Sequence, residues 1–267
     1  MIAAGIDVGS SATKAVLLQD GLMVAYHIAA TGAESVGAAT ATMEAALAKA
    51  GVAWGDVGYT VATGYGRVLV PFAQETVTEL SCHARGAAHL VPTARTILDM
   101  GGQDCKAIRC DEAGRLRKFV MNDKCAAGTG RFLELMAAVL GLPLDDIGAE
   151  ALAAERAVKI NSTCAVFAKS EVAQLMRRGE ARAEVLAGLH QSIVNRTFNL
   201  VRRVGLEADF VMTGGIAKNI GMVRLLEAKA GMTARIPPEP QIVGALGAAL
   251  FAQDRLHGKG SEGGSGQ

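Results

Sequence analysis

The sequence predicts an α/β fold of two duplicated lobes with a ligand cleft between them. The first observation is a repeat: residues 6–16 (IDVGSSATKAV) and 98–108 (LDMGGQDCKAI) align without a gap and share Asp, Gly and Lys. The second is the alternation of strand-like and helical stretches along the rest of the chain. The third is a set of glycine turns that follow apolar strands. Such patterns are typical of layered α/β architectures whose ligand lies between the halves.

The individual elements follow from these patterns. Each copy of the repeat is predicted to form a strand ending in Asp, a tight glycine turn and a second strand, which together make a β-hairpin. The remaining strands and helices are expected at residues 22–29, 34–50, 57–62, 116–121, 183–204, 210–213 and 241–256.

Two lobes follow from the duplication. We expect the first lobe at residues 1–93, completed by a returning helix at 242–256, and the second at 94–241. The Gly- and Ser-rich residues 258–267 are expected to form a flexible tail. Half of the residues are hydrophobic and only 4% are aromatic, so the cores should consist of Ala, Val, Leu and Ile.

Composition excludes several classes of partner. The chain has 27 Lys plus Arg against 26 Asp plus Glu, which gives no electrostatic case for nucleic acid or an anionic membrane. We expect no signal peptide, and no run approaches the roughly 20 apolar residues of a membrane span. Five cysteines, an odd number, argue against a disulfide framework and favour a reducing cytoplasm.

The two hairpin turns have the composition of phosphate-binding loops. Glycine lets backbone N–H groups approach a phosphate, and nearby hydroxyls and a lysine add donors and charge. Asp7 and Asp99 cannot bind phosphate directly, so we assign them to Mg²⁺ or to the attacking water. The residues expected to line the phosphates are Gly9, Ser10, Ser11, Thr13, Lys14, Gly101, Gly102, Gln103 and Asp104.

A third glycine turn, MTGGIAKN at residues 212–219, lies between an apolar strand and a helix. It suits a nucleoside lying flat on the backbone, which places Gly214, Gly215 and Lys218 near that nucleoside. Glu134 could reach the ribose, although a solvent-facing role is an equal alternative for this residue. One glycine pair alone marks only a turn; three such turns in this order are much more specific.

Two cysteines stand in an unusual setting. Cys125 (in MNDKCAAGTGRFLE) and Cys164 (in NSTCAVFAKSEV) each precede a predicted helix, among small residues. The unpaired N–H groups there stabilise a thiolate or a sulfido cluster. A [4Fe–4S] site generally takes four thiolates, which a symmetric homodimer would supply. Zinc with the same four ligands stays open at this point. Cys105 and Cys110 are expected to be core residues.

The three turns resemble those of the actin, hexokinase and 70-kDa heat-shock ATPase superfamily. GIDVGSSATK is similar to its first phosphate loop, LDMGGQD to its second and MTGGIAKN to its adenosine loop. VGALGAALFA at residues 243–252 resembles the helix that crosses back between the lobes. The resemblance implies ribonuclease H-like lobes, with ATP or ADP and Mg²⁺ in the cleft between them.

The cysteine motifs carry a closer resemblance. Together with ATGYGR (62–67) and ELSCHARGA (79–87), they are similar to the activator ATPases of (R)-2-hydroxyacyl-CoA dehydratases, within the BadF/BadG/BcrA/BcrD type. This resemblance implies a homodimer with one [4Fe–4S] cluster on Cys125 and Cys164, and so favours iron over zinc. It also implies reduced flavodoxin or ferredoxin as electron donor and an iron–sulfur dehydratase as acceptor. Cys82 and His83 are interpreted as structural or as partner contacts.

Three alternatives remain at this stage. The chain could be the ATPase subunit of a benzoyl-CoA reductase complex, which uses the same chemistry. It could be a small-molecule kinase, such as a sugar kinase, or a nucleotide-gated regulator with structural zinc. The sequence does not identify the hydroxyacyl-CoA of the partner, the electron donor or the number of ATP molecules per electron.

Overall fold

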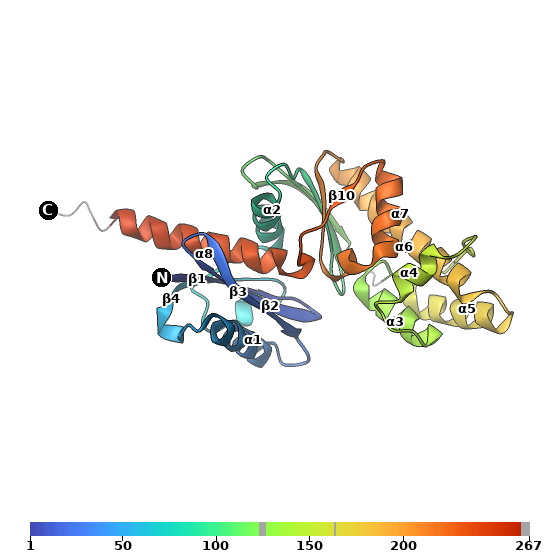
Figure 1. Ribbon diagram of the computed structural model, residues 1–267, viewed down its shortest axis with the longest axis horizontal. Coiled ribbons are helices and arrows are strands. Elements are labelled where there is room, and N and C mark those ends of the chain that lie inside the picture. Colours follow the sequence, from blue (N-terminus) through green and yellow to red (C-terminus); the bar gives the residue numbers. More distant parts are fainter. Residues whose placement is uncertain (123–126, 163, 263–267) are drawn as a thin grey trace. The chain divides into compact units, whose positions relative to one another are not determined.

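The computed structural model describes residues 1–122, 127–162 and 164–262, which divide into two compact units. The first unit comprises Met1–Thr93, Cys110–Leu116 and the chain from Gln241 onward; the second comprises Ala94–Arg109 and Arg117–Pro240. Each unit contains one five-stranded mixed sheet with helices packed on it (Figure 1). The predicted α/β class with two lobes is therefore confirmed.

The sheet of the first unit has the order β3–β2–β1–β4–β5. Neighbouring strands are antiparallel from β1 to β3, as hairpins require, whereas β4 pairs in parallel with β1 and β5 with β4. The central strand β1 is buried along its whole length, which explains its continuous apolar sequence. The strands are β1 (Ile2–Val8), β2 (Ala12–Gln19), β3 (Leu22–Ala30), β4 (Val57–Thr63) and β5 (Glu75–Thr76).

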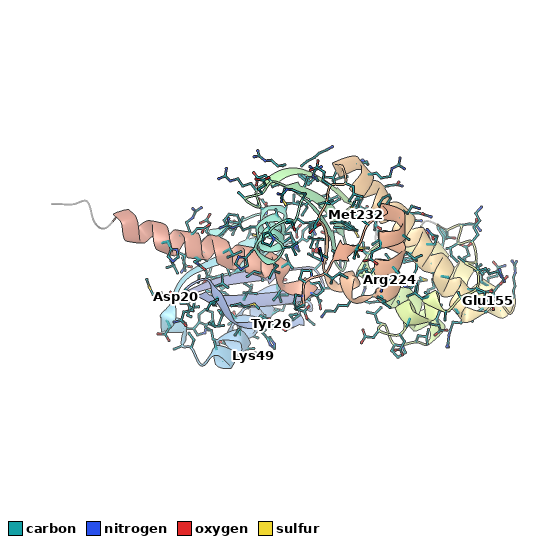
Figure 2. The ribbon with its side chains drawn as sticks, turned by 45° about the horizontal axis from the view of Figure 1, so that its top comes forward. Asp20, Tyr26, Lys49, Glu155, Arg224 and Met232 are labelled. Carbon is teal, nitrogen blue, oxygen red and sulfur yellow. The ribbon has the colours of Figure 1, made fainter. Side chains whose placement is uncertain are left out.

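Helices cover both faces of this sheet, because alternate residues of a strand point to opposite sides. Ile6 and Val8 of β1 share a buried cluster with Met43 of α1 (Ser35–Ala50). Ala3, on the other face, packs with Ala249 of α8 (Val243–Glu262). Lys49 at the end of α1 lies over the ring of Tyr26 in β3, 5.6 Å from its centre, and so joins helix to sheet (Figure 2).

Small residues allow α8 to approach its neighbours closely. A Cβ atom on Gly247 would lie 1.8 Å from the carbonyl oxygen of Cys82 in α2 (Glu79–Leu90). A Cβ on Gly5 of β1 would lie 2.1 Å from the carbonyl oxygen of Ala245. Any larger side chain at either position would separate these elements.

The sheet of the second unit repeats this topology, in the order β10–β9–β6–β7–β8. The antiparallel register that pairs Asp7 with Lys14 also pairs Asp99 with Lys106, and the duplication is therefore structural as well as sequential. The strands are β6 (Thr96–Met100), β7 (Cys105–Cys110), β8 (Leu116–Asn122), β9 (Phe210–Thr213) and β10 (Ala234–Arg235).

Helices of the second unit pack into one large buried cluster. Leu186, Leu189, Ile193 and Val201, which recur at helical spacing in the sequence, are all buried on the long helix α6. The helices are α3 (Gly130–Leu140), α4 (Ile147–Leu152), α5 (Ala165–Arg177), α6 (Arg182–Val204) and α7 (Ile220–Ala230).

Helix α8 extends further than the sequence predicts. Helix α8 runs to Glu262 and so continues into residues 258–262, which the sequence assigns to a flexible tail.

Within the described part of the chain, none of the helices combines the length and apolar character that crossing a bilayer takes.

Candidate functional site

The first glycine turn is a compact loop above Asp7. The N–H of Gly9 donates to the carbonyl oxygen of Ala12 at 3.1 Å, which closes the turn between β1 and β2. Lys14 Nζ lies 3.0 Å from Asp7 Oδ2, and both side chains are largely buried. Ser10 and Ser11 reach the surface of the turn. This arrangement brings an ammonium, a carboxylate and two hydroxyls to one strand end.

Thr13 differs from its neighbours, because it lies beneath the turn. Its side chain is fully buried and its hydroxyl is 3.0 Å from the hydroxyl of Thr31. Thr31 in turn donates to the carbonyl oxygen of Gly9 at 2.7 Å. The structure therefore gives Thr13 a supporting position under the loop, and its predicted contact with phosphate stays a prediction.

The second turn has the same closure and an additional acid. The N–H of Gly101 donates to the carbonyl oxygen of Asp104 at 3.0 Å, where the first turn has Ala12. Lys106 Nζ lies 2.7 Å from Asp104 Oδ2 and 3.6 Å from Asp99 Oδ2, and all three side chains are buried. Gln103 is exposed at the tip. By formal charge this turn carries one more carboxylate than its counterpart, which favours a divalent cation.

The third turn packs directly on Asp99. Thr213, at the end of β9, donates its hydroxyl to Asp99 Oδ1 at 2.8 Å. A Cβ on Gly214 would lie 2.4 Å from the carbonyl oxygen of Met100, and its φ of +83° also favours glycine. Gly215 is exposed, and Lys218 Nζ lies 2.9 Å from Glu239 Oε2 at the surface. The turn that is predicted to bind adenosine is thus bonded to Asp99, the residue that is predicted to hold Mg²⁺ or the attacking water.

The structure adds a fourth turn that the sequence reasoning does not assign to the site. Thr63 of β4 pairs with Asp7 as Thr213 pairs with Asp99. A Cβ on Gly64 would lie 2.4 Å from Asp7 Oδ1, and its φ is +85°. The N–H of Gly66 donates to the carbonyl oxygen of Val8 at 2.9 Å. The sequence does contain a sign of this turn, because a Thr-Gly pair follows an apolar strand in both halves of the chain.

Helix α3 begins against the second turn. The N–H groups of Gly130 and Arg131 donate to the carbonyl oxygens of Gly101 and Gly102 at 2.9 and 2.8 Å. A groove of about 300 Å³ runs along this helix, and the Glu134 carboxylate in it accepts a bond from Arg131 Nη1 at 2.9 Å. The groove is lined by Arg131, Phe132, Glu134, Leu135, Ala138 and Ala165. Glu134 therefore lies on the helix that is bonded to the second turn.

Cys164 is exposed and directly precedes α5. It is the N-cap residue, its carbonyl oxygen accepts the first helical bond from Ala168 at 2.8 Å, and its own side chain makes no capping bond. Cys125 lies outside the described residues. An exposed thiol at the start of a helix is open to a metal or an inorganic cluster from outside the unit.

The other described cysteines have a different environment. Cys82, Cys105 and Cys110 are buried. Burial raises the pKa of Cys82 to about 12, and burial also raises the pKa of Cys105. The thiol of Cys105 donates to the carbonyl oxygen of Gly128 at 3.0 Å. The thiols of Cys82 and Cys105 therefore stay protonated at neutral pH. The expectation that Cys105 and Cys110 are core residues is confirmed.

The described residues do not complete a metal site by themselves. Among residues 1–122, 127–162 and 164–262, no group of three or more Cys, His, Asp or Glu side chains is placed to hold a metal ion. A site that uses the exposed thiol of Cys164 therefore needs ligands beyond those of the described residues.

Comparison with known proteins gives relatives over nearly the whole chain. The chain is 48% identical over 260 residues to the activator of lactoyl-CoA dehydratase of Anaerotignum propionicum, covering 97% of this chain and 100% of the relative. It is 44% identical over 250 residues to the (R)-2-hydroxyglutaryl-CoA dehydratase activating ATPase of Acidaminococcus fermentans, covering 93% and 95%.

A solved structure shows the same fold. The activator of the 2-hydroxyisocaproyl-CoA dehydratase from Clostridium difficile, solved with bound ADPNP, superposes with a TM-score of 0.93 at 40% identity and 98% coverage of each chain. This likeness confirms the predicted class of two duplicated actin-like ATPase lobes. Residues 4–252 match the BadF/BadG/BcrA/BcrD ATPase family, and with these relatives the chain belongs to that family of ATPases.

Proposed function

We propose that this chain is the ATP-driven activator of a (R)-2-hydroxyacyl-CoA dehydratase. In this proposal a cytoplasmic homodimer holds one [4Fe–4S] cluster through Cys125 and Cys164 of both copies. Reduced flavodoxin or ferredoxin supplies the electron, and the iron–sulfur dehydratase receives it. The printed functions of the similar proteins support the dehydratase partner.

One observation of the structure carries the cluster part of the proposal. Cys164 is an exposed thiol at the start of α5, whereas the other described cysteines are buried. A buried thiol with a raised pKa is a poor metal ligand, because the ligand form is the thiolate. The N–H groups at the start of α5 favour a negatively charged partner. When bound, the cluster supplies one low-potential electron at a time.

The glycine turns support nucleotide binding. We assign the phosphates to the Gly9 and Gly101 turns, and Mg²⁺ or the attacking water to Asp7 and Asp99, with Gln103 and Asp104 beside them. Lys14 and Lys106 keep these buried carboxylates paired. We assign the adenosine to Gly214, Gly215 and Lys218, with Glu134 toward the ribose. The expectation that both lobes contribute to one nucleotide site stays a prediction.

Contacts of the second turn suggest how nucleotide and thiol communicate. Gly130 and Arg131 are bonded to the carbonyl oxygens of Gly101 and Gly102, and Cys105 is bonded to Gly128. Phosphate binding at this turn would therefore act on residues 128–131, which come shortly after Cys125 in the chain. ATP lowers the reduction potential only if it binds the oxidised form more tightly, by roughly 59 mV for each tenfold preference. By reciprocity, the reduced form binds ATP more weakly by the same factor.

Strictly anaerobic purification tests the proposal. We expect about four iron and four sulfide per dimer, as one [4Fe–4S] cluster requires, and an EPR signal after reduction. Cys125→Ser and Cys164→Ser should abolish the cluster while ATP binding persists, and Cys82→Ala is the control with an intact cluster. With ATP, the protein should reduce a 2-hydroxyacyl-CoA dehydratase. Zinc in place of iron, or phosphorylation of a sugar by an iron-free protein, would refute the proposal.

A further inference from the structure

A carboxylate on α5 binds the chain that leads into Cys164. Glu171 Oε1 accepts bonds from the backbone N–H of Asn161 at 2.9 Å and from the Asn161 side-chain amide at 3.1 Å. Its other oxygen, Oε2, accepts the backbone N–H of Ser162 at 2.8 Å. Asn161 and Ser162, which precede Cys164 in the chain, are therefore bonded to the helix that follows Cys164.

The charge state of Glu171 agrees with this geometry. Burial alone would raise the pKa of its carboxyl, but the bonds from Ser162 and Asn161 together hold that pKa below the ordinary value. Bonds from N–H groups stabilise the ionised form, so the carboxylate is charged at neutral pH. In the described part of the chain, Glu171 makes no ion pair with a Lys, Arg or His side chain, and its oxygens serve the segment before Cys164.

This contact constrains the direction from which the chain enters α5. Asn161 and Ser162 lie outside any helix or strand, so no ladder of hydrogen bonds fixes their backbone. The Glu171 carboxylate takes that role, because it pairs two successive backbone donors that would otherwise face solvent. Since Glu171 is itself fixed on α5, the approach to Cys164 is set relative to the axis of that helix.

We propose that Glu171 is a positioning residue for Cys164, which holds the cysteine in the orientation that a ligand shared between two copies requires. This inference rests on the proposed function, since it takes Cys164 as a cluster ligand. A cluster at a two-fold axis tolerates little freedom, because each cysteine must meet the symmetric centre from its own subunit. The carboxylate does not touch the cysteine; it acts through residues 161 and 162.

The test compares variants of the full-length protein purified without oxygen. Glu171→Ala removes the bonds from Asn161 and Ser162, and Glu171→Gln keeps one carbonyl oxygen as an acceptor and should rescue part of the effect. Glu150→Gln is the matched control, because Glu150 is a carboxylate of the same unit that binds Arg182 instead, at 2.6 Å. Two quantities are measured: hydrogen exchange of the Asn161 and Ser162 amides, and the rate at which a chelator removes iron.

We expect exchange of both amides in Glu171→Ala to be at least about tenfold faster than in the wild type, the effect of losing a bond to a charged group. Iron loss should accelerate by a similar factor, the EPR signal should broaden, and ATP affinity should not change. The exchange and iron-loss rates of Glu171→Gln should lie between those of the wild type and those of Glu171→Ala. Glu150→Gln should match the wild type in each measurement.

The possible failures are distinguishable. Faster exchange with unchanged iron loss and an unchanged EPR signal would show a loop contact without a positioning role, which overturns the inference and leaves the proposed function intact. Unchanged exchange in Glu171→Ala would overturn it as well. A wild-type protein without iron would overturn the proposed function itself, before any variant is compared.

Discussion

Thr213 donates its hydroxyl to Asp99 at 2.8 Å, and both side chains are buried at the ends of adjacent parallel strands. This bond ties the loop assigned to adenosine to the carboxylate assigned to Mg²⁺ or water. It also fixes the orientation of the carboxylate plane, because the other oxygen faces Lys106.

Thr213→Val should therefore weaken both stability and ATP hydrolysis. Valine has nearly the same shape but no donor, so the free energy of unfolding should fall by about 1–2 kcal/mol, the typical cost of a lost buried bond. Urea unfolding and the steady-state rate of hydrolysis measure the two effects. Hydrolysis at the wild-type rate would mean that the orientation of Asp99 does not matter to the reaction.

Lys106→Met should destabilise the protein much more than Lys14→Met. Lys106 is buried between Asp99 and Asp104, so its removal leaves two buried carboxylates without their cation, at a cost of about 3–5 kcal/mol. Lys14 serves Asp7 alone and is itself more exposed. Equal denaturation midpoints for the two variants would contradict this reading of the charges.

Gly64→Ala should lower the stability and the ATP affinity of the protein more than Gly141→Ala does. Both glycines have a positive φ, +85° and +67°, so both variants share the backbone strain of about 1–2 kcal/mol. Only the Gly64 variant also places its Cβ against Asp7 Oδ1 and the Val8 carbonyl, whereas Gly141 has open space around it. ATP affinity, measured by calorimetry, should fall in Gly64→Ala and not in Gly141→Ala; the reverse order would exclude the fourth turn from the site.

Stability should fall as the pH drops below neutrality because of His190. Burial lowers the pKa of this histidine beneath its ordinary 6.5. The unfolded chain then takes up the proton at a higher pH than the folded chain, so stability present above pH 6.5 is lost as the pH falls. The contacts agree: one ring nitrogen is 2.8 Å from the Leu186 carbonyl oxygen, and the other faces the Asn219 amide nitrogen at 3.1 Å.

Asn219→Asp is the matched variant for this effect. An aspartate still caps α7, as the Asn219 oxygen does by accepting from Met222, but it presents an oxygen to the ring nitrogen of His190. Protonated His190 would then be stabilised, and its pKa should rise. Unfolding free energies measured from pH 8 to pH 5 should decline less in the variant. A steeper decline than in the wild type would refute the assignment.

The sequence predicts the fold well where polar residues recur in fixed roles. Asp, Gly and Lys in both hairpins have the same register in the structure because each serves the same strand pair. The role of Thr13 cannot be predicted in this way. It lies on the strand face of Ala15 and Leu17, which pack in the core, and a hydroxyl can satisfy a buried partner as readily as a phosphate. The residues next to Thr13 in the sequence do not show whether its hydroxyl binds a buried partner or a phosphate.

The missed residues depend on contacts between distant segments. Gly64 matters because β4 pairs with β1 and brings Thr63 beside Asp7. The Thr-Gly pair marks a turn in the sequence, but the pairing that places this turn at Asp7 joins segments far apart in the chain. Glu171 matters because the chain before α5 turns back along that helix. In the sequence it is one more charged residue on an amphipathic helix, where the usual expectation is a solvent-facing side chain.

The return of α8 to the first unit has a consequence for biosynthesis. This helix covers one face of the first sheet, yet it is made only after the whole second unit has been synthesised. Until then the apolar residues Ala3, Val16 and Val61 lack their cover, so the first unit must wait in an incomplete state that is open to aggregation. The N-terminal unit is thus expected to mature last, the reverse of the usual order along a nascent chain.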